Sequence, residues 1–440
     1  MSETMLTTVA IVLMAVLFIV LIWGKVSPVI AMTLLPIIAC IVCRFPLSDV
    51  GDWVTAGLKS QVSTVSMFVF AIIFFSCVMD TGVFDTILGK LLGNAKNVTL
   101  VCLLTVAATM LGHLDGSGAT TFLLVIPPFL IIYRKMNIRP VVLMGLTSMT
   151  AGIMNMLPWG GPCARVAIGL ELSPNEIFMA ALPGFVIGLI CMFILAFFMA
   201  HIEIRRGAGV PEGTNIRRML AEETNLDPEK DALRRPKLFW FNLILVTATI
   251  VLVFLVTSVP TTLVFAIASG IALMVNYPGA KEQAKRLSAY APSCMTMVTI
   301  GLAAGIYSGI FTNSPLQDAM SNSITGLISH GAAAHLNTVM GYLWAPLTTV
   351  GLNHEATVYT IIPTISEIVK DYVSPAQVGG TYLMTYVTRT FANPLTAAMY
   401  VGLGLSGVDM KEHLRFTLPW ALLISTIIIT VVLLLGFLPF

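Results

Sequence analysis

The chain has 440 residues, of which 57% are hydrophobic and only 10% are charged, and its formal net charge is +2. Soluble domains carry about 25% charged residues, so this chain has too little polar surface to coat a water-soluble particle. The composition therefore predicts an all-α polytopic protein embedded in the lipid bilayer. No basic tract resembles a nucleic-acid-binding patch, so we expect no nucleic-acid partner.

Apolar runs of helical length follow one another along the chain. The first half has runs at about 5–23, 26–43, 63–80, 98–133, 140–172 and 176–200. The second half has runs at about 238–257, 260–277, 292–312, 333–370, 375–406 and 417–438. The first run lacks the basic flank and cleavage site of a signal peptide, so we expect a retained span. Residues 201–237 between the halves are hydrophilic and predict a solvated cytoplasmic loop.

Two runs in each half are too long for one span and are interrupted near the middle. Run 98–133 is broken by GHLDGSG and run 140–172 by NMLPWGGP. Runs 333–370 and 375–406 are broken by GLNHEA and FANPLT. Because a helix of about 20 residues crosses the hydrocarbon, we predict that the first run of each pair is a re-entrant hairpin and the second a discontinuous helix. Two complete spans are the alternative for each hairpin.

The two halves resemble each other at an offset of 236 residues. The offset aligns identical residues at Thr121 and Thr357, Ile126 and Ile362, Pro127 and Pro363, Pro158 and Pro394, Leu182 and Leu418, and Pro183 and Pro419. Proline has a structural meaning in a helix, so its recurrence favours an internal duplication. Each repeat, 1–200 and 238–440, then has about five spans and one hairpin. This odd number of spans predicts that the second repeat is inverted relative to the first.

Lysine and arginine residues predict the orientation of the chain. If the N-terminus lies outside, most of the 24 Lys and Arg residues fall on the cytoplasmic side, as the positive-inside rule requires. Both termini are then outside, and the loop 202–236 is cytoplasmic. Arg165 and Arg389 have no loop to occupy, because they lie within apolar runs.

Broken helices at matching positions in inverted repeats are typical of the midplane site of a secondary transporter. Backbone that leaves the helix at this depth must be buried in protein or line a cavity. The start of the second hairpin helix, after HLDGSG, offers hydroxyl groups, free N–H groups and a positive helix dipole, which suit an anion. An arginine within the membrane is costly, and a guanidinium grips carboxylates in a bidentate manner. The substrate-binding candidates are Ser117, Gly118, Thr120, Thr121, Gly160, Gly161, Arg165, Asn353, Thr357, Arg389, Asn393 and Thr396.

Acidic and imidazole groups near the same breaks predict that a cation or proton enters with the anion. The candidates for this coupling are His113, Asp115, His354 and Glu355. Each candidate also has a structural interpretation. Asp115 would then only cap the hairpin helix, the histidines would be packed polar residues, and an arginine would pair with an acid such as Glu171.

The segments HLDGSGATTFLLVIPPFLIIYRKMNIRP and AGIMNMLPWGGPCARVA resemble the citrate–divalent-metal:proton symporter (CitMHS) family of the ion transporter superfamily. The resemblance extends over the whole chain to FTLPWALL. It implies proton-driven uptake of citrate complexed with a divalent metal, Mg²⁺ or Ca²⁺, and no resident cofactor. It also implies a homodimer in the bacterial inner membrane, with scaffold and transport domains and an elevator mechanism. Asn393-Pro394 replaces the Ser-Pro expected there, which leaves another di- or tricarboxylate open.

Other functions remain as alternatives. A sodium-coupled carboxylate transporter of the same fold would hold Na⁺ at the unwound carbonyls around Asn155 and Asn393. An intramembrane enzyme would use His354 with Glu355, or His113 with Asp115, as a metal or acid–base site. No H-E-x-x-H motif is present, and the duplication favours alternating access, so we expect a transporter and not an enzyme. Broken helices with charged groups favour a carrier over a channel.

Overall fold

The structure is a computed structural model. It describes residues 2–23, 25–92, 97–209, 231–255, 259–316, 319, 330–349, 354, 357–393 and 396–439. Every regular element in these ranges is helical, which confirms the predicted all-α class. Within the described residues, six helices are long and apolar enough to cross a membrane: 47–80, 118–135, 174–205, 236–254, 280–313 and 410–434. Asn353, Glu355 and Pro394 lie outside the described residues.

The helices follow the interruptions expected from the sequence, except that of GLNHEA only His354 lies within the described residues. The first half contains α1 (Glu3–Trp23), α2 (Pro28–Val42), α3 (Leu47–Asp80), α4 (Val83–Leu92), α5 (Val98–Gly112), α6 (Gly118–Lys135), α7 (Pro140–Met154), α8 (Gly161–Gly169) and α9 (Pro174–Arg205). The second half contains η1 (Pro236–Leu238), α12 (Phe239–Leu255), α13 (Thr261–Asn276), α14 (Ala280–Asn313), α16 (His330–Thr349), η2 (Thr357–Ile361), α18 (Ile362–Val369), α19 (Pro375–Tyr386), η3 (Val387–Arg389), α20 (Ala397–Ser406) and α21 (Met410–Leu434).

Helices of similar length recur in the same order in the two halves. Both α3 and α14 have 34 residues. The interrupted pair α7 and α8 has a counterpart in α19 and α20, and each pair is followed by a long helix, α9 or α21. The duplication and the inversion of the second repeat stay predictions.

Two of the long helices begin earlier than the apolar runs indicate. Helix α3 starts at Leu47, directly after Pro46, and α14 starts at Ala280, after Gly279 with φ +105°. A hydropathy pattern marks only where side chains are apolar, whereas a helix ends where its backbone is interrupted. At 1.5 Å per residue each helix is about 51 Å long and extends beyond a hydrocarbon core of about 30 Å.

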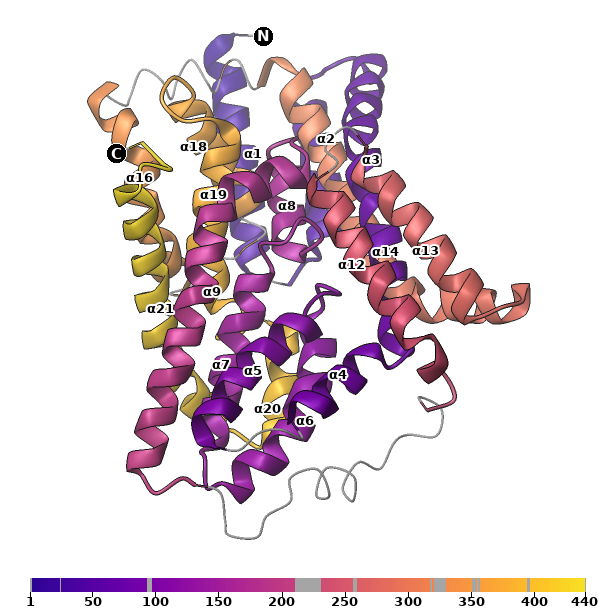
Figure 1. Ribbon diagram of the computed structural model, residues 1–440. Coiled ribbons are helices and arrows are strands. Elements are labelled where there is room, and N and C mark those ends of the chain that lie inside the picture. The colour runs from indigo at the N-terminus through magenta and orange to yellow at the C-terminus, as the bar shows by residue number, and fades with distance from the viewer. Residues whose placement is uncertain are drawn as a thin grey trace.

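The helices gather into two groups (Figure 1). One group, called here the α3/α14 group, contains α3 packed on α13 and α14, with α2 against α14 and α12 against α13. The other, called the hairpin group, is built around α9, which packs against α5, α7, α19 and α21. Helix α8 contacts both α3 and α14. Both chain termini lie toward one end of the molecule, and the C-terminal end of α9 lies at the other (Figure 1).

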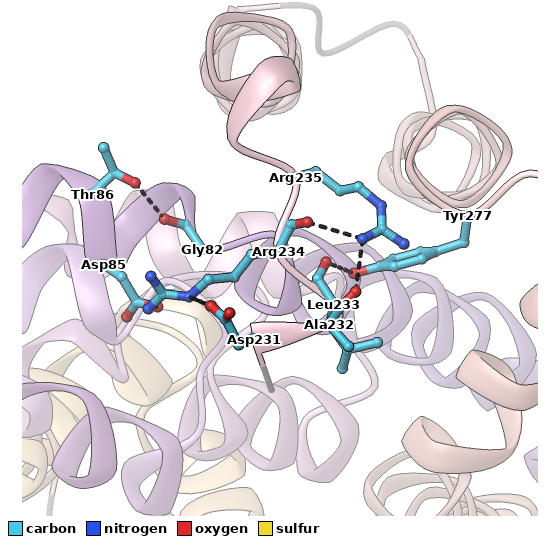
Figure 2. Close-up of polar contacts among 9 residues, drawn as sticks. All are labelled: Gly82, Asp85, Thr86, Asp231, Ala232, Leu233, Arg234, Arg235 and Tyr277. Atoms are coloured by element: carbon cyan, nitrogen blue, oxygen red, sulfur yellow. Dashed lines mark hydrogen bonds and ion pairs between the residues drawn. The ribbon is translucent and has the colours of Figure 1, made fainter. Parts of the chain in front are cut away.

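The last residues before α12 are tied by side-chain contacts to α4 and to the end of α13 (Figure 2). Arg234 Nη2 lies 2.6 Å from Asp85 Oδ2 on α4. The guanidinium of Arg235 lies 4.7 Å from the ring centroid of Tyr277, and the Tyr277 hydroxyl donates to Leu233 O at 3.1 Å. The chain therefore enters α12 from a defined position beside α4 and α13.

Helices α3 and α14 approach each other closely through glycine. A Cβ atom added at Gly57 would overlap the carbonyl oxygen of Gly305 and lie 2.5 Å from Gly309 Cα. Small residues spaced by four let two membrane helices bring their backbones together. The close contact holds these two long helices as one unit.

A methyl group at this crossing is expected to destabilise the protein. Gly57→Ala forces two backbones apart, and such overpacking costs about 1–3 kcal/mol. Gly51→Ala on the same helix is the control, because a Cβ there meets nothing within 4 Å. We expect a lower Tm in detergent for Gly57→Ala and no loss for Gly51→Ala. Equal melting temperatures would contradict the close crossing.

Candidate functional site

The first interruption lies between α5 and α6 and consists of residues 113–117. Gly116 makes the turn with φ +71°, a conformation that favours glycine. The Ser117 N–H donates to Asp115 Oδ1 at 2.9 Å, and Ser117 Oγ accepts from the Thr120 N–H at 3.4 Å. The polar residues therefore shape the turn and cap the start of α6.

The second interruption, residues 155–160 between α7 and α8, lies against the first. Trp159 Nε1 donates to Leu114 O at 2.8 Å, and a Cβ at Gly116 would lie 3.1 Å from Trp159 O. Pro162 stands in the first turn of α8, where its missing N–H costs no helical hydrogen bond. These contacts bring the N-termini of α6 and α8 together.

The corresponding interruption in the second half lies between η3 and α20. Thr396 precedes α20, and its hydroxyl donates to Thr390 O at 2.7 Å. A Cβ at Gly152 of α7 would overlap the Val387 carbonyl, so the two discontinuous helices cross in direct backbone contact. Phe391 O lies 2.9 Å from Nε2 of the buried His413, which ties this segment to α21.

A cavity of about 510 Å³ lies where these interruptions face α3 and α14. Ten residues predicted from the sequence line it: Asp115, Ser117, Gly118, Thr120, Asn155, Gly161, Arg165, His354, Asn393 and Thr396. The rest of its wall is not among the predicted site residues, although Gly116, Trp159 and Pro162 belong to the predicted breaks: Phe68, Ile72, Ser76, Gly116, Trp159, Pro162, Ser293, Thr296, Met297, Tyr386, Thr390 and Phe391.

The cavity is suited to an anion by its helix ends. The first residues of α6 and α8 line it, and so does Thr396, which immediately precedes α20. Free N–H groups and the positive end of the dipole favour negative charge at such termini. Arg165 adds a full positive charge one turn into α8, while Asp115 adds a carboxyl group on the hairpin side.

Arg389 does not line the cavity. Its side chain is 1% exposed, Nε donates to Thr348 Oγ1 at 2.7 Å, and the guanidinium lies 5.0 Å from the ring centroid of Tyr386. Tyr386 does line the cavity, and His354 stacks on it with ring centroids 4.6 Å apart. Arg389 therefore contacts an aromatic wall residue, whereas Arg165 is itself part of the wall.

Four other predicted residues, His113, Thr121, Gly160 and Thr357, also do not line the cavity. His113 is fully buried, with Nδ1 2.7 Å from Thr121 Oγ1 and Nε2 3.1 Å from Asn155 Oδ1. Thr357 is buried in the π-helical turn η2, and Gly160 is the N-cap of α8. The predicted residues Asn353 and Glu355 lie outside the described part of the chain.

Comparison with known proteins gives a consistent result. The model of the family described as "Citrate transporter" matches residues 1–388. The "Citrate transporter" of Bacillus subtilis (strain 168) is 32% identical over 439 residues, which cover 99% of this chain and 100% of the relative. The "Mg(2+)/citrate complex secondary transporter" of the same organism is 31% identical over 431 residues, covering 96% of this chain and 97% of the relative.

A solved structure shares the fold. The YdaH transporter of Alcanivorax borkumensis superimposes with a TM-score of 0.60 at 12% sequence identity, covering 90% of this chain and 89% of that chain. At this identity the likeness concerns the fold alone. The family match and the two relatives span the chain, and both relatives are transporters. This chain therefore belongs to the citrate transporter family and is a transporter, not an enzyme.

Proposed function

We propose that this protein is a secondary active transporter that takes up citrate as a complex with a divalent metal, Mg²⁺ or Ca²⁺, in symport with protons. The observation that carries the proposal is the convergence of three helix N-termini and Arg165 on one cavity of about 510 Å³. Citrate has three carboxylates, and a guanidinium with free N–H groups can bind them together.

The acid in the cavity supports a metal complex over bare citrate. Asp115 would repel a trivalent anion, but a divalent cation bound to citrate lowers that charge and accepts carboxylate oxygens as ligands. A relative that matches nearly the whole chain is named as a Mg(2+)/citrate complex secondary transporter. We therefore assign the substrate carboxylates to the Arg165 side and the metal to the Asp115 side.

Proton coupling is assigned to titratable groups on the wall. Asp115 and His354 both line the cavity, and acids and imidazoles are the usual proton carriers in membrane transporters.

The second candidate function is that of a sodium-coupled carrier. It is favoured by the unwound backbone at Asn155 and Asn393, both of which line the cavity.

The two helix groups suit an elevator movement, with the α3/α14 group as scaffold and the hairpin group as transport domain. Helix α8 extends from the main cavity, at Arg165, to a second cavity of about 200 Å³ beside Gly169 and Tyr307 of α14. Movement of α8 along α14 would carry the site from one side of the α8–α14 contact to the other.

We further propose a homodimer in the bacterial inner membrane, with both termini outside and the loop 202–236 in the cytoplasm.

Uptake into proteoliposomes tests the proposal. We expect labelled citrate to accumulate in sodium-free buffer under an inward proton gradient, and only with Mg²⁺ or Ca²⁺ present. A chelator or a proton ionophore should stop it. Accumulation that requires sodium would support the second candidate, and equal uptake with chelator would refute the metal complex.

A further inference from the structure

His113, Thr121 and Asn155 form a buried chain of hydrogen bonds that ends at the cavity. His113 lies behind the wall with both ring nitrogens engaged, Nδ1 at 2.7 Å from Thr121 Oγ1 and Nε2 at 3.1 Å from Asn155 Oδ1. Asn155 is the C-cap of α7 and lines the cavity. The hydrogen bond between His113 and Asn155 therefore constrains the orientation of the Asn155 amide group.

The direction of these hydrogen bonds follows from the donors available. Asn155 Oδ1 is only an acceptor, so His113 Nε2 must carry a hydrogen and donate to it. If the ring is neutral, Nδ1 accepts the Thr121 hydroxyl hydrogen. If the ring is charged, Nδ1 donates to Thr121 Oγ1, and the Thr121 hydroxyl donates to Ser117 O, which lies 2.7 Å away. The arrangement at Asn155 is the same in both protonation states.

Because its oxygen faces His113 on the buried side, Asn155 turns its amide NH₂ group away from His113 and toward the cavity that it lines. No side-chain hydrogen bond other than that from His113 is seen for Asn155 among the described residues. An NH₂ group donates to carboxylates and cannot be a ligand of a cation, which needs oxygen.

We infer that Asn155 is a specificity-determining residue that donates to a carboxylate of the substrate, and that His113 is the positioning residue that fixes this orientation. The inference deepens the proposed function and rests on it. In this role the Asn155 side chain donates a hydrogen bond through its NH₂ group, whereas a sodium ligand would use its oxygen. It also explains why a histidine at the hairpin tip is buried behind the cavity.

Asn155→Asp tests the orientation directly. The aspartate keeps an acceptor for His113 but replaces the donor that faces the cavity with a second carboxylate oxygen. We expect the KM for citrate uptake to rise about tenfold or more, as for loss of a hydrogen bond to a charged group, with Vmax much less affected. The control is Asn97→Asp, because Asn97 Oδ1 only accepts the Leu100 N–H at the exposed start of α5. An unchanged KM for citrate would overturn the inference.

Two substitutions of His113 test the positioning role independently. A glutamine amide can reach the place of Nε2 and donate to Asn155, whereas an asparagine amide reaches only the place of Nδ1 and contacts Thr121. We expect the KM of His113→Gln to be closer to wild type than that of His113→Asn. Equal KM values for the two variants would contradict the role. Failure of wild-type citrate uptake would instead refute the proposed function, so the two failures are distinguishable.

Discussion

Replacing Arg165 with alanine is expected to abolish citrate binding at millimolar concentrations and to stop uptake. Arg165 lines the cavity one turn into α8 and lies beside the N-termini that favour an anion. Truncating one partner of a buried, hydrogen-bonded charge pair costs about 2–5 kcal/mol, which raises Kd about 30-fold to several thousand-fold. Calorimetric titration of purified variants with metal–citrate measures the change.

Two further variants make the result for Arg165 specific. Arg165→Lys keeps the charge but loses the planar fork, so we expect binding between that of wild type and alanine. Arg206→Ala removes an exposed arginine at the end of α9 and should leave Kd unchanged. Full-strength binding by Arg165→Ala would remove this residue from the site.

Asp115→Asn should lower the apparent affinity of citrate uptake for the divalent metal. Asparagine keeps an acceptor for the Ser117 N–H, which is 2.9 Å from Asp115 Oδ1, so the hairpin turn is preserved and only the charge is lost. Loss of a charge-assisted contact worth about 1.5–3 kcal/mol raises the half-maximal metal concentration about tenfold or more. Metal titrations of citrate uptake measure this shift.

A matched control separates this role from simple helix capping. Asp409 accepts the N–H of Lys411 two residues later, at 3.0 Å, at the exposed start of α21, as Asp115 accepts the N–H of Ser117. Asp409→Asn should leave the metal titration unchanged. If both substitutions behave alike, Asp115 is only a cap, and the metal lies elsewhere.

The interruptions of the helices could be predicted from sequence because glycine and proline act through the local backbone. The breaks at GHLDGSG and NMLPWGGP appear as turns between regular helices. The extent of α3 could not be predicted from hydropathy, because its polar first half continues the helix beyond the apolar run. The amphipathic helix α4 was likewise missed, since it is too short to form an apolar run.

The candidate site could be predicted only in part, for a related reason. Residues at the breaks, such as Ser117 and Asn393, are revealed by their motifs and line the cavity. Ser76 and Thr296 come from uninterrupted apolar helices, where no local pattern marks the face that meets the cavity. The sequence also cannot distinguish an arginine on the wall from one behind an aromatic ring. Tertiary packing alone separates Arg165 from Arg389.

The central claim is that metal and citrate cross the membrane together. Its most direct test is to measure the uptake of labelled citrate and of labelled divalent metal simultaneously in the same proteoliposomes under a proton gradient. We expect that each enters only in the presence of the other and that their ratio stays constant as either concentration is varied. Citrate entry at an undiminished rate while the metal remains outside would contradict it.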